Sequence, residues 1–590
     1  MAHIISKFQI DNFKSIKNQE FELSNFTPLV GYNNAGKSNI LEAIKWILRK
    51  TSLPLSSFND ANQPITMIAS IEGISEDILN NIDQVHRARI EPFLNNETLT
   101  IKRIQETPGQ TVAQIRLLVL DPNDNITWQN NPAGIDNAIK DLFPEPIHIG
   151  AMENSEDDIS KSSSTSTIGK LLAEIIGPIE LQYGQQVNDA LNGLKDILDV
   201  EGANRAPELE TFDQEINDKL DAFFPDIRVK VHIPTPELKE VFKKGIIKVY
   251  ENLFPNPKDV SSLGHGAQRS IQMTLIRHLA DLKLNQQQNR TTTLLLIDEP
   301  ELYLHPQAVE ILRKSLNILS NQGYQVIFST HSPFMITQKD VGNTILVRKN
   351  GILGTYKRTT LKSAIPIIEN QAQHQLTLLY SLSNSSNILF SEKVILAEGK
   401  TENRLLPTII EKVTSKTILL HKTALVKIDG SGNTRKTMQV LSTMDLPTKA
   451  IVDLDFALKN GISEGYLLAN NADIQACLNE VANIAVANNI AIGVDGWPSK
   501  NGNSVTAAEG FAILAQSPNI QQNIINISAV MQANNIWIWK KGTIENHLSL
   551  TGKNEGVWAN FCNNLEQTDL QTLLPNDYQE VENCIHWIMN

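Results

Sequence analysis

Residues 31–38 constrain the fold of this chain more than any other segment. They read Gly-Tyr-Asn-Asn-Ala-Gly-Lys-Ser and match the pattern G-x-x-x-x-G-K-[ST] in full, between an extended segment and a helical pattern that runs from Ser38 to about Arg49. The glycines let backbone N–H groups approach phosphate oxygens, Lys37 supplies positive charge to the β and γ phosphates, and Ser38 offers a hydroxyl to Mg²⁺. This arrangement predicts an α/β fold with a nucleoside triphosphate site.

A pair of acids complements that loop. Leu294-Leu-Leu-Ile-Asp298-Glu299 is an apolar run that ends in two carboxylates, which is typical of a buried parallel strand. Ligands bind beyond the carboxyl ends of such strands. We therefore expect Asp298 to hold the Mg²⁺ shell and Glu299 to polarise the attacking water.

Length and charge bound the remaining possibilities. The chain has 590 residues, and at roughly 100–200 residues per domain it should contain about three or four units. It has no apolar stretch of membrane-spanning length and no signal-peptide pattern, so we expect a cytoplasmic protein without a membrane partner. The net charge of −13 disfavours a protein that coats DNA, and the three cysteines lack metal-site spacing.

Hydrophobic periodicity predicts the surrounding elements. Over residues 64–150 strand-like runs alternate with turn clusters, two helical segments follow, and strands then return. Strands are expected at Ile65–Ile71, Leu99–Ile104, Thr111–Leu120, Val229–Ile233 and Ile246–Tyr250, and helices at Ile168–Leu198 and Leu209–Phe224.

A second group of acids lies in the C-terminal third. Val394-Ile-Leu-Ala-Glu398-Gly-Lys-Thr-Glu402 predicts a strand, a turn and a helix from about Thr401, and Lys449-Ala-Ile-Val-Asp453-Leu-Asp455 predicts another strand. Strand alternation would place Asp453 and Asp455 on one face. Clustered carboxylates repel one another unless a cation compensates, and oxygen ligands suit Mg²⁺ or Mn²⁺. We expect one or two such ions here, able to activate water against a phosphodiester.

Two further features carry positive charge. In Ile536-Trp-Ile-Trp-Lys540-Lys541-Gly-Thr-Ile-Glu545, either lysine could stabilise charge that develops on a phosphate, while Glu545 could bind metal or orient a lysine. Basic residues also gather between Lys400 and Lys436, where they could guide a nucleic-acid backbone.

The N-terminal motifs resemble those of ABC-type ATPases of the RecF/SMC branch. Ser262-Leu-Gly-His-Gly-Ala-Gln268-Arg269 is similar to the signature loop, although it departs from the usual Leu-Ser-Gly-Gly-Gln, and Phe328-Ser-Thr-His331 is similar to the switch-histidine segment. The resemblance implies an ATP site shared between two copies, and hence at least a dimer. The ATP-binding residues that it implies are Gly31, Asn34, Gly36, Lys37, Ser38, Asn39, Gly264, Gln268, Asp298 and His331.

The C-terminal acids resemble the Toprim pattern, in which Glu-Gly and Asp-x-Asp end two strands. An ABC-type ATPase followed by Toprim resembles the OLD (overcoming lysogenization defect) family of nucleases, related to the nuclease subunit of Gabija and to retron effectors. The resemblance implies metal-dependent DNA cleavage in phage defence. It makes Glu398, Glu402, Asp453 and Asp455 metal ligands and Lys541, or Lys540, the catalytic lysine; Asp495 is a weaker candidate, more often a turn aspartate.

We therefore predict an α/β chain with an ABC-type P-loop ATPase, a short helical insertion and a C-terminal Toprim domain. The expected parts are residues 1–155 and 226–383 for the ATPase, 156–225 for an insertion that could mediate dimerisation, and 384–590 for the Toprim nuclease. The predicted activity is ATP-binding, metal-dependent endonucleolytic cleavage of DNA by a homodimer or homotetramer. A defence partner such as a reverse transcriptase with its DNA product is a further expectation. The alternatives are a RecF-type repair ATPase and a sensor that acts through a partner, both without nuclease activity of their own.

Overall fold

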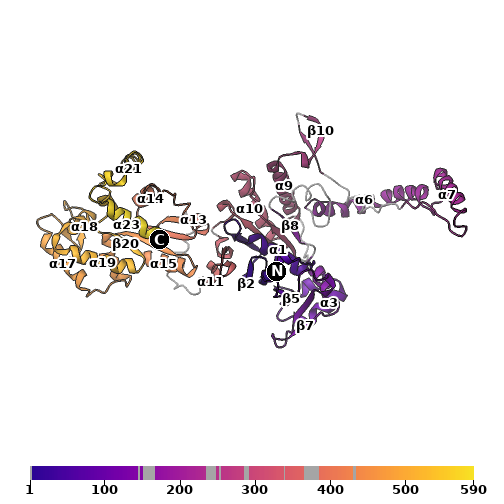
Figure 1. Cartoon of the computed structure of the whole chain (residues 1–590), viewed down its shortest axis with the longest axis horizontal. Helices are drawn as coiled ribbons and strands as arrows, with labels where there is room; N and C mark the ends of the chain where they lie inside the picture. Colours follow the sequence, from indigo (N-terminus) through magenta and orange to yellow (C-terminus); the bar gives the residue numbers. More distant parts are fainter. Residues whose placement is uncertain are drawn as a thin grey trace. The chain divides into compact units, whose positions relative to one another are not determined.

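The computed structural model of the chain describes residues 3–143, 146–150, 167–233, 247–251, 254–284, 292–337, 339–364, 385–428 and 433–590. Two compact units are present (Figure 1). The first comprises residues 1–29, 33–335 and 347–356, and the second residues 30–32, 336–346 and 357–590. The expected boundaries at residues 155 and 383 lie outside the described residues.

A twelve-stranded sheet organises the first unit, in the order β7-β6-β5-β4-β1-β2-β14-β13-β3-β12-β11-β8. Its bounds are β1 Ile4–Phe13, β2 Ile16–Glu22, β3 Phe26–Val30, β4 Ile65–Glu72, β5 Leu99–Gln105, β6 Arg116–Leu120, β7 Trp128–Asn130, β8 Ile147–Ile149, β11 Thr293–Ile297, β12 Tyr324–Thr330, β13 Ile345–Asn350 and β14 Gly354–Lys357. The strands from β7 to β1 pair antiparallel, whereas β11 pairs parallel with β12 and β8.

The parallel part of this sheet is buried, as its continuous apolar runs predict. Every residue of β12 is buried, and so are the last four of β11. Helix α10 (Pro306–Ser320) packs against β12, with Leu312, Leu316 and Leu319 in the core shared with the two strands. The nucleotide-loop helix α1 (Lys37–Leu48) and the helix after the signature segment, α9 (His265–Leu284), complete the frame of the site.

Most predicted elements are present, and one strand is shorter than expected. Helices α6 (Thr167–Leu198) and α7 (Pro207–Leu220) form the insertion. Within Thr111–Leu120 only the second half is a strand. Thr111 and Gln114 form a capping box that starts a short 3₁₀ turn, with the Thr111 N–H donating to Gln114 Oε1 at 3.1 Å.

The predicted strand at Val229–Ile233 is wrong. This segment is extended, but side chains of the insertion occupy its backbone groups. The Val229 N–H donates to Asn217 Oδ1 at 2.7 Å, and the Val231 N–H donates to Asp213 Oδ1 at 2.9 Å. Because the hydrogen bonds are made to helix α7, they are not made to a neighbouring strand.

The second unit is a doubly wound parallel sheet of order β16-β15-β17-β20. The bounds are β15 Lys393–Ala397, β16 Thr423–Lys427, β17 Thr448–Asp453 and β20 Ile536–Trp539. Alternate residues of the same strand enter two separate cores: Ala450 and Val452 pack in one, Ile451 in the other. The helices that cover the sheet include α14 (Lys400–Thr414), α15 (Thr434–Thr443), α19 (Gln521–Ala533), α21 (Glu555–Gln567) and α23 (Tyr578–Met589).

Within the described part of the chain, none of the helices is both long enough and apolar enough to cross a bilayer.

Candidate nucleotide and metal sites

The loop before α1 has the backbone conformation of an anion-binding nest. Asn34 and Gly36 both adopt positive φ, 65° and 101°, so their N–H groups turn toward a common centre at the helix start. A Cβ at residue 36 would lie 2.2 Å from Thr355 Oγ1, so only glycine fits there. The Asn39 side chain contacts Ser15 instead, because its amide donates to Ser15 Oγ at 2.8 Å.

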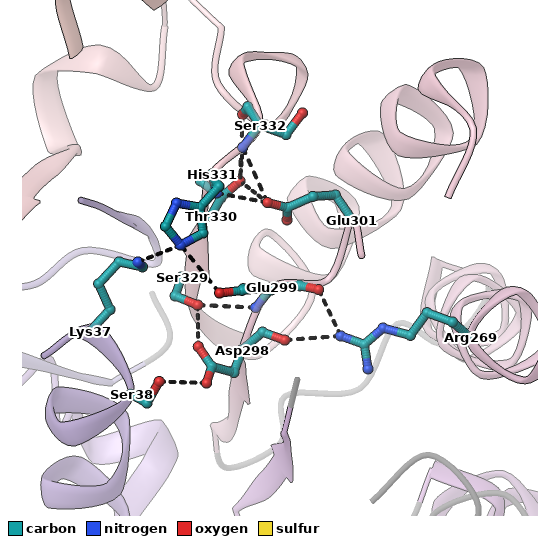
Figure 2. Close-up of polar contacts among 10 residues, drawn as sticks. All are labelled: Lys37, Ser38, Arg269, Asp298, Glu299, Glu301, Ser329, Thr330, His331 and Ser332. Atoms are coloured by element: carbon teal, nitrogen blue, oxygen red, sulfur yellow. Dashed lines mark hydrogen bonds and ion pairs between the residues drawn. The ribbon is translucent and has the colours of Figure 1, made fainter. Parts of the chain in front are cut away.

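Lys37, Glu299 and His331 meet beside the loop (Figure 2). His331 Nε2 lies 2.7 Å from Lys37 Nζ and 3.2 Å from Glu299 Oε1. The hydrogen bond to His331 is the main cause of a lowered pKa at Glu299, and the charge of Lys37 adds to it. Burial lowers the pKa of Lys37, while the fields of Glu299 and Asp298 oppose that effect. Glu299 is therefore held ionised, as a group that polarises water must be.

Asp298 faces the hydroxyl that was expected to share Mg²⁺ with it. Ser38 Oγ donates to Asp298 Oδ2 at 2.6 Å, and Ser329 Oγ donates to the other carboxylate oxygen. Ser329 also accepts from the Glu299 N–H at 3.0 Å. The Ser38 hydroxyl, in the first turn of α1, and the Asp298 carboxylate, which follows β11, are hard oxygen ligands, and they fit a small divalent cation.

Glu301 is a functional position that the sequence reading missed. Its Oε1 accepts from Thr330 Oγ1 at 2.7 Å, from the His331 N–H at 2.7 Å and from the Ser332 N–H at 3.1 Å (Figure 2). Three donors on one oxygen fix the loop that carries the switch histidine. The signal available in the sequence was a third acid in Asp298-Glu299-Pro-Glu301.

The signature segment lies at the start of α9. Gly264 is exposed, and a Cβ there would meet nothing within 4 Å. The Gln268 amide donates to Leu263 O at 2.9 Å within its own loop. The next residue, Arg269, bonds to the backbone carbonyls of Asp298 and Glu299, both at 2.9 Å.

Three of the predicted metal ligands in the second unit come together. One carboxylate oxygen each from Glu398, Asp453 and Asp455 lies within 4.8 Å of the other two. Glu398 follows β15 and Asp453 ends β17, which are paired and parallel, so their side chains share one sheet edge. The Asp453 N–H donates to Glu398 Oε2 at 2.9 Å and fixes the two acids relative to each other.

Asp455 reaches this cluster by a route different from the predicted one. The strand ends at Asp453, and Leu454 and Asp455 are already helical, directly before the π-helical turn Phe456–Asn460. The Leu454 N–H donates to Gly542 O at 2.8 Å and so bends the chain away from the sheet. A turn at the strand end, rather than alternation along a strand, therefore brings Asp455 beside Asp453.

Glu402 lies beside the three acids in the first turn of α14 and is only 3% exposed. A Cβ at residue 399 would lie 2.7 Å from Glu402 Oε2, so the Glu402 carboxylate lies directly over the glycine that follows Glu398. Burial, together with the fields of Glu545 and Glu398, raises the pKa of Glu402 to about 7. Glu402 therefore faces this acidic cluster as predicted, although it is not one of the three oxygens that lie closest together.

The other acids of the cluster have raised pKa values for the same reasons. Burial raises the pKa of Glu398 to about 7, against the hydrogen bond from the Asp453 N–H, which lowers it. Burial raises the pKa of Asp453 well above its usual range, and the fields of Glu402, Glu398 and Asp455 add to the effect. Buried like charges of this kind need a compensating cation or a proton.

The residues present fit a divalent cation. Asp453 Oδ1 is buried and has no hydrogen-bond donor among the described residues. A buried carboxylate oxygen without a donor is costly unless something binds it. Carboxylate oxygens are the ligands that Mg²⁺ and Mn²⁺ prefer.

Lys540 and Lys541 both pair with acids at the start of α23 rather than with the cluster. Lys540 Nζ lies 3.0 Å from Glu580 Oε1, and Lys541 Nζ lies 2.7 Å from Asp577 Oδ1. Buried His547 completes this second group, with Nδ1 3.0 Å from Asp577 Oδ1 and Nε2 accepting from the Lys541 N–H at 3.1 Å. These contacts tie the end of β20 to a helix.

Lys553, which the sequence did not predict, is a lysine whose charge acts on all four acids. Its field lowers the pKa of all four acids against the effect of burial. Lys553 Nζ lies 3.1 Å from Glu545 Oε2, and Glu545 Oε1 accepts from Thr401 Oγ1 at 2.5 Å. Glu545 thus orients a lysine, one of its two predicted roles. Lys553 lies in a loop without a strand or a motif, so no sequence signal pointed to it.

Asp495 is not in the three-acid cluster. Its Oδ2 lies 3.3 Å from Lys459 Nζ, and its Oδ1 accepts from the Trp497 N–H at 3.2 Å in a turn. Lys459 in turn lowers the pKa of Asp455, against the larger effect of burial.

Family models match both units. An AAA ATPase domain matches residues 4–104 and 104–336, and the TOPRIM domain of overcoming lysogenization defect protein-like proteins matches residues 389–455. The second match contains Glu398, Glu402, Asp453 and Asp455.

Curated proteins match over most of the chain. The chain is 37% identical to the Old nuclease of Escherichia phage P2 over 597 aligned positions, covering 99% of both proteins. It is 23% identical to endonuclease GajA of Bacillus cereus (strain VD045), covering 69% of this chain and 68% of that protein. Among solved structures, an SMC head bound to the C-terminal winged-helix domain of ScpA covers 61% of this chain, with 15% identity and a TM-score of 0.36.

The raised pKa values predict how pH changes stability without divalent ions. An acid whose pKa rises from 4.5 to about 7 binds more protons in the folded than in the unfolded chain. The protonated acid therefore stabilises the folded chain at low pH. This stabilisation is lost, and the free energy of unfolding falls, as pH rises through about 7. Asp453→Asn removes one of the repelling charges. We expect it to raise the unfolding temperature in EDTA at pH 8 by roughly 2–6 °C, and by less at pH 5.5.

Calorimetry of the whole chain measures this, with Glu566→Gln, an exposed acid on α21, as the control. Mn²⁺ should stabilise the wild type and not Asp453→Asn. A variant that unfolds below the wild type at pH 8 in EDTA would contradict charge repulsion in the cluster.

Proposed function

This chain belongs to the OLD family of nucleases, and from that premise we propose that it is an ATP-binding endonuclease that cleaves DNA with divalent metal ions. The observation that carries the proposal is the meeting of Glu398, Asp453 and Asp455, from two strand ends, within 4.8 Å. A role in anti-phage defence, like the defence partner, is an extension of the same proposal.

In the proposed reaction Glu398, Asp453 and Asp455 would hold one Mg²⁺ or Mn²⁺, and Glu402 would contribute to a second. Such ions lower the pKa of bound water and stabilise charge on a phosphate. The chain's own residues fix the geometry. Asp453 is anchored through its N–H to Glu398, and Asp455 is set by the turn that Gly542 stabilises. Deprotonation of these acids must accompany ion binding, so cleavage depends on pH near neutrality.

Lys553 replaces Lys541 as the proposed catalytic lysine. Burial alone lowers the pKa of Lys553, but the fields of Glu545 and Asp453 raise it overall, so the ammonium keeps its charge. A charged donor beside the metal-binding acids stabilises the negative charge that develops on phosphorus-bound oxygens. Lys541 pairs with Asp577 and has a structural role instead, because this contact ties the end of β20 to α23.

ATP binding is proposed to control assembly or access, because phosphodiester hydrolysis needs no ATP. Ser38 and Asp298 hold Mg²⁺, Lys37 contacts the phosphates, and Glu299 polarises water. Gly264 and Gln268 are proposed to cap ATP bound to a second copy, which makes a homodimer or a pair of dimers the working form. The basic residues between Lys400 and Lys436 would guide DNA to the acids.

Cleavage of DNA is the direct test. Wild-type protein should nick or cut plasmid and linear DNA with Mg²⁺ or Mn²⁺, and Asp453→Ala should lower the rate by about 1000-fold or more, because an incomplete ligand set no longer holds the ion. Glu566→Ala is the matched control, since this acid is exposed on a helix surface. Absence of cleavage by the wild type under every metal and ATP condition would favour a sensor ATPase.

The two lysine sites give a sharper comparison. We expect Lys553→Ala to lower the cleavage rate about 100-fold at saturating metal, the cost of losing one donor to developing charge. Lys541→Ala should leave the rate within about threefold, because a partly exposed ion pair adds little. Single-turnover cleavage of a labelled duplex measures both. The reverse order of effects would restore Lys541 as the catalytic lysine.

The insertion offers a surface for self-association. Beyond helix α7, Phe223 and Phe224 are 77% and 56% exposed. We expect the double variant Phe223→Ser, Phe224→Ser to shift the mass of the protein toward the single chain, because apolar area is lost from the contact. Light scattering after size exclusion measures it. Ile352→Ser, at an apolar side chain 83% exposed elsewhere, should have no effect. An unchanged mass for the double variant would place the contact on another surface.

A further inference from the structure

Arg269 is a buried cation that the nucleotide chemistry described above does not use. It lies in the first turns of α9, directly after the signature residue Gln268, and its side chain is 2% exposed. A buried guanidinium costs free energy unless acceptors surround it. The hydrogen-bond acceptors of Arg269 therefore indicate which groups this residue positions.

Two of those acceptors are the backbone carbonyls of the proposed catalytic acids. One guanidinium nitrogen of Arg269 donates to Asp298 O and Glu299 O, both at 2.9 Å (Figure 2). The other terminal nitrogen donates to Gln272 Oε1 at 2.7 Å and to Gly150 O at 3.3 Å. Gln272 is fully buried on the same helix and orients the guanidinium.

Glu299 requires such support. Its φ is 47°, in the left-handed region that side chains with a Cβ rarely adopt. Strained backbone persists where surrounding groups fix it. Arg269 binds the carbonyls of the two peptide groups that flank the Glu299 Cα. On its other side, the Glu299 side chain reaches His331, and its N–H donates to Ser329.

We propose that Arg269 is a positioning residue for ATP hydrolysis, which holds Glu299 in its water-polarising conformation and links it to the signature helix. The proposal rests on the proposed function. A displacement of α9 when the signature segment engages a nucleotide moves the guanidinium, and with it the peptide of Glu299. When the signature segment of one subunit caps the nucleotide of its partner, the position of Glu299 in the first subunit's own nucleotide site therefore changes as well.

A lysine is the informative substitution. It keeps the positive charge but lacks the planar group that reaches several acceptors at fixed angles. We expect Arg269→Lys to lower the kcat of ATP hydrolysis about 30- to 100-fold, since small displacements of a catalytic group have effects of this size. The Kd for ATP should stay within about twofold, because Lys37 and Ser38 are unchanged. Arg277→Lys, an exposed arginine on the same helix, is the control.

A double-mutant cycle with Glu299→Gln separates positioning from general damage. If Arg269 acts through Glu299, Arg269→Lys should change the residual rate of Glu299→Gln by less than about threefold, because residues that act as a unit are not additive. A full additional loss in the Glu299→Gln background, or an equal loss of kcat and ATP affinity, would overturn the proposal. So would an Arg269→Lys variant with wild-type kcat.

Gln272→Met provides a second variant in case Arg269→Lys does not fold. It removes the acceptor that orients the guanidinium and leaves Arg269 in place, so we expect a smaller fall in kcat, about 3- to 10-fold, again with unchanged ATP affinity. An unchanged kcat in this folded variant would count against the proposal. Wild-type protein that hydrolyses no ATP would instead refute the proposed ATPase and the role of Arg269 together.

Discussion

Both candidate sites depend on the geometry of parallel strands that end at a common sheet edge. Neighbouring strands such as β11 and β12 in the first unit, or β15 and β17 in the second, point their carboxyl ends in one direction. Residues that follow these ends are distant in sequence and adjacent in space. Glu299 and His331 meet in this way, and so do Glu398 and Asp453. The order and direction of the strands, more than side-chain packing, therefore bring the residues of each site together.

Concentrating acids at such an edge is electrostatically unfavourable, and the two units compensate in different ways. At the nucleotide site, the hydrogen bond with His331 and the charge of Lys37 lower the pKa of Glu299 from within the fold. At the second site, Lys553 offsets only part of the repulsion among four acids, and burial keeps the pKa of Asp453 well above its usual range. A fold with internal cations is ready to polarise water, whereas one with excess buried acid is ready to receive metal.

The sequence was sufficient for residues whose position follows from strand ends and helix starts. The loop at 31–38, Asp298 and Glu299, and the pair Glu398 and Asp453 all belong to this class. It was insufficient where a tertiary contact decides the outcome. Asp455 depends on the Gly542 carbonyl, and Lys553 on Glu545. The expected strand at Val229–Ile233 failed because α7 side chains take its hydrogen bonds, which local hydrophobicity cannot reveal.

The supporting residues share one property that accounts for their absence from motif patterns. Arg269 and Glu301 act mainly on backbone groups: the former on the carbonyls of Asp298 and Glu299, the latter on the N–H groups of His331 and Ser332. A contact to a backbone group does not depend on the residue type of the partner. Such a contact therefore leaves no pattern in the sequence that relates the two positions. The same property makes these contacts suited to regulation. In the proposed ATPase they would set the conformation of Glu299 without touching the substrate, so a moving helix would change the rate of hydrolysis while the phosphate-binding loop keeps its affinity for ATP.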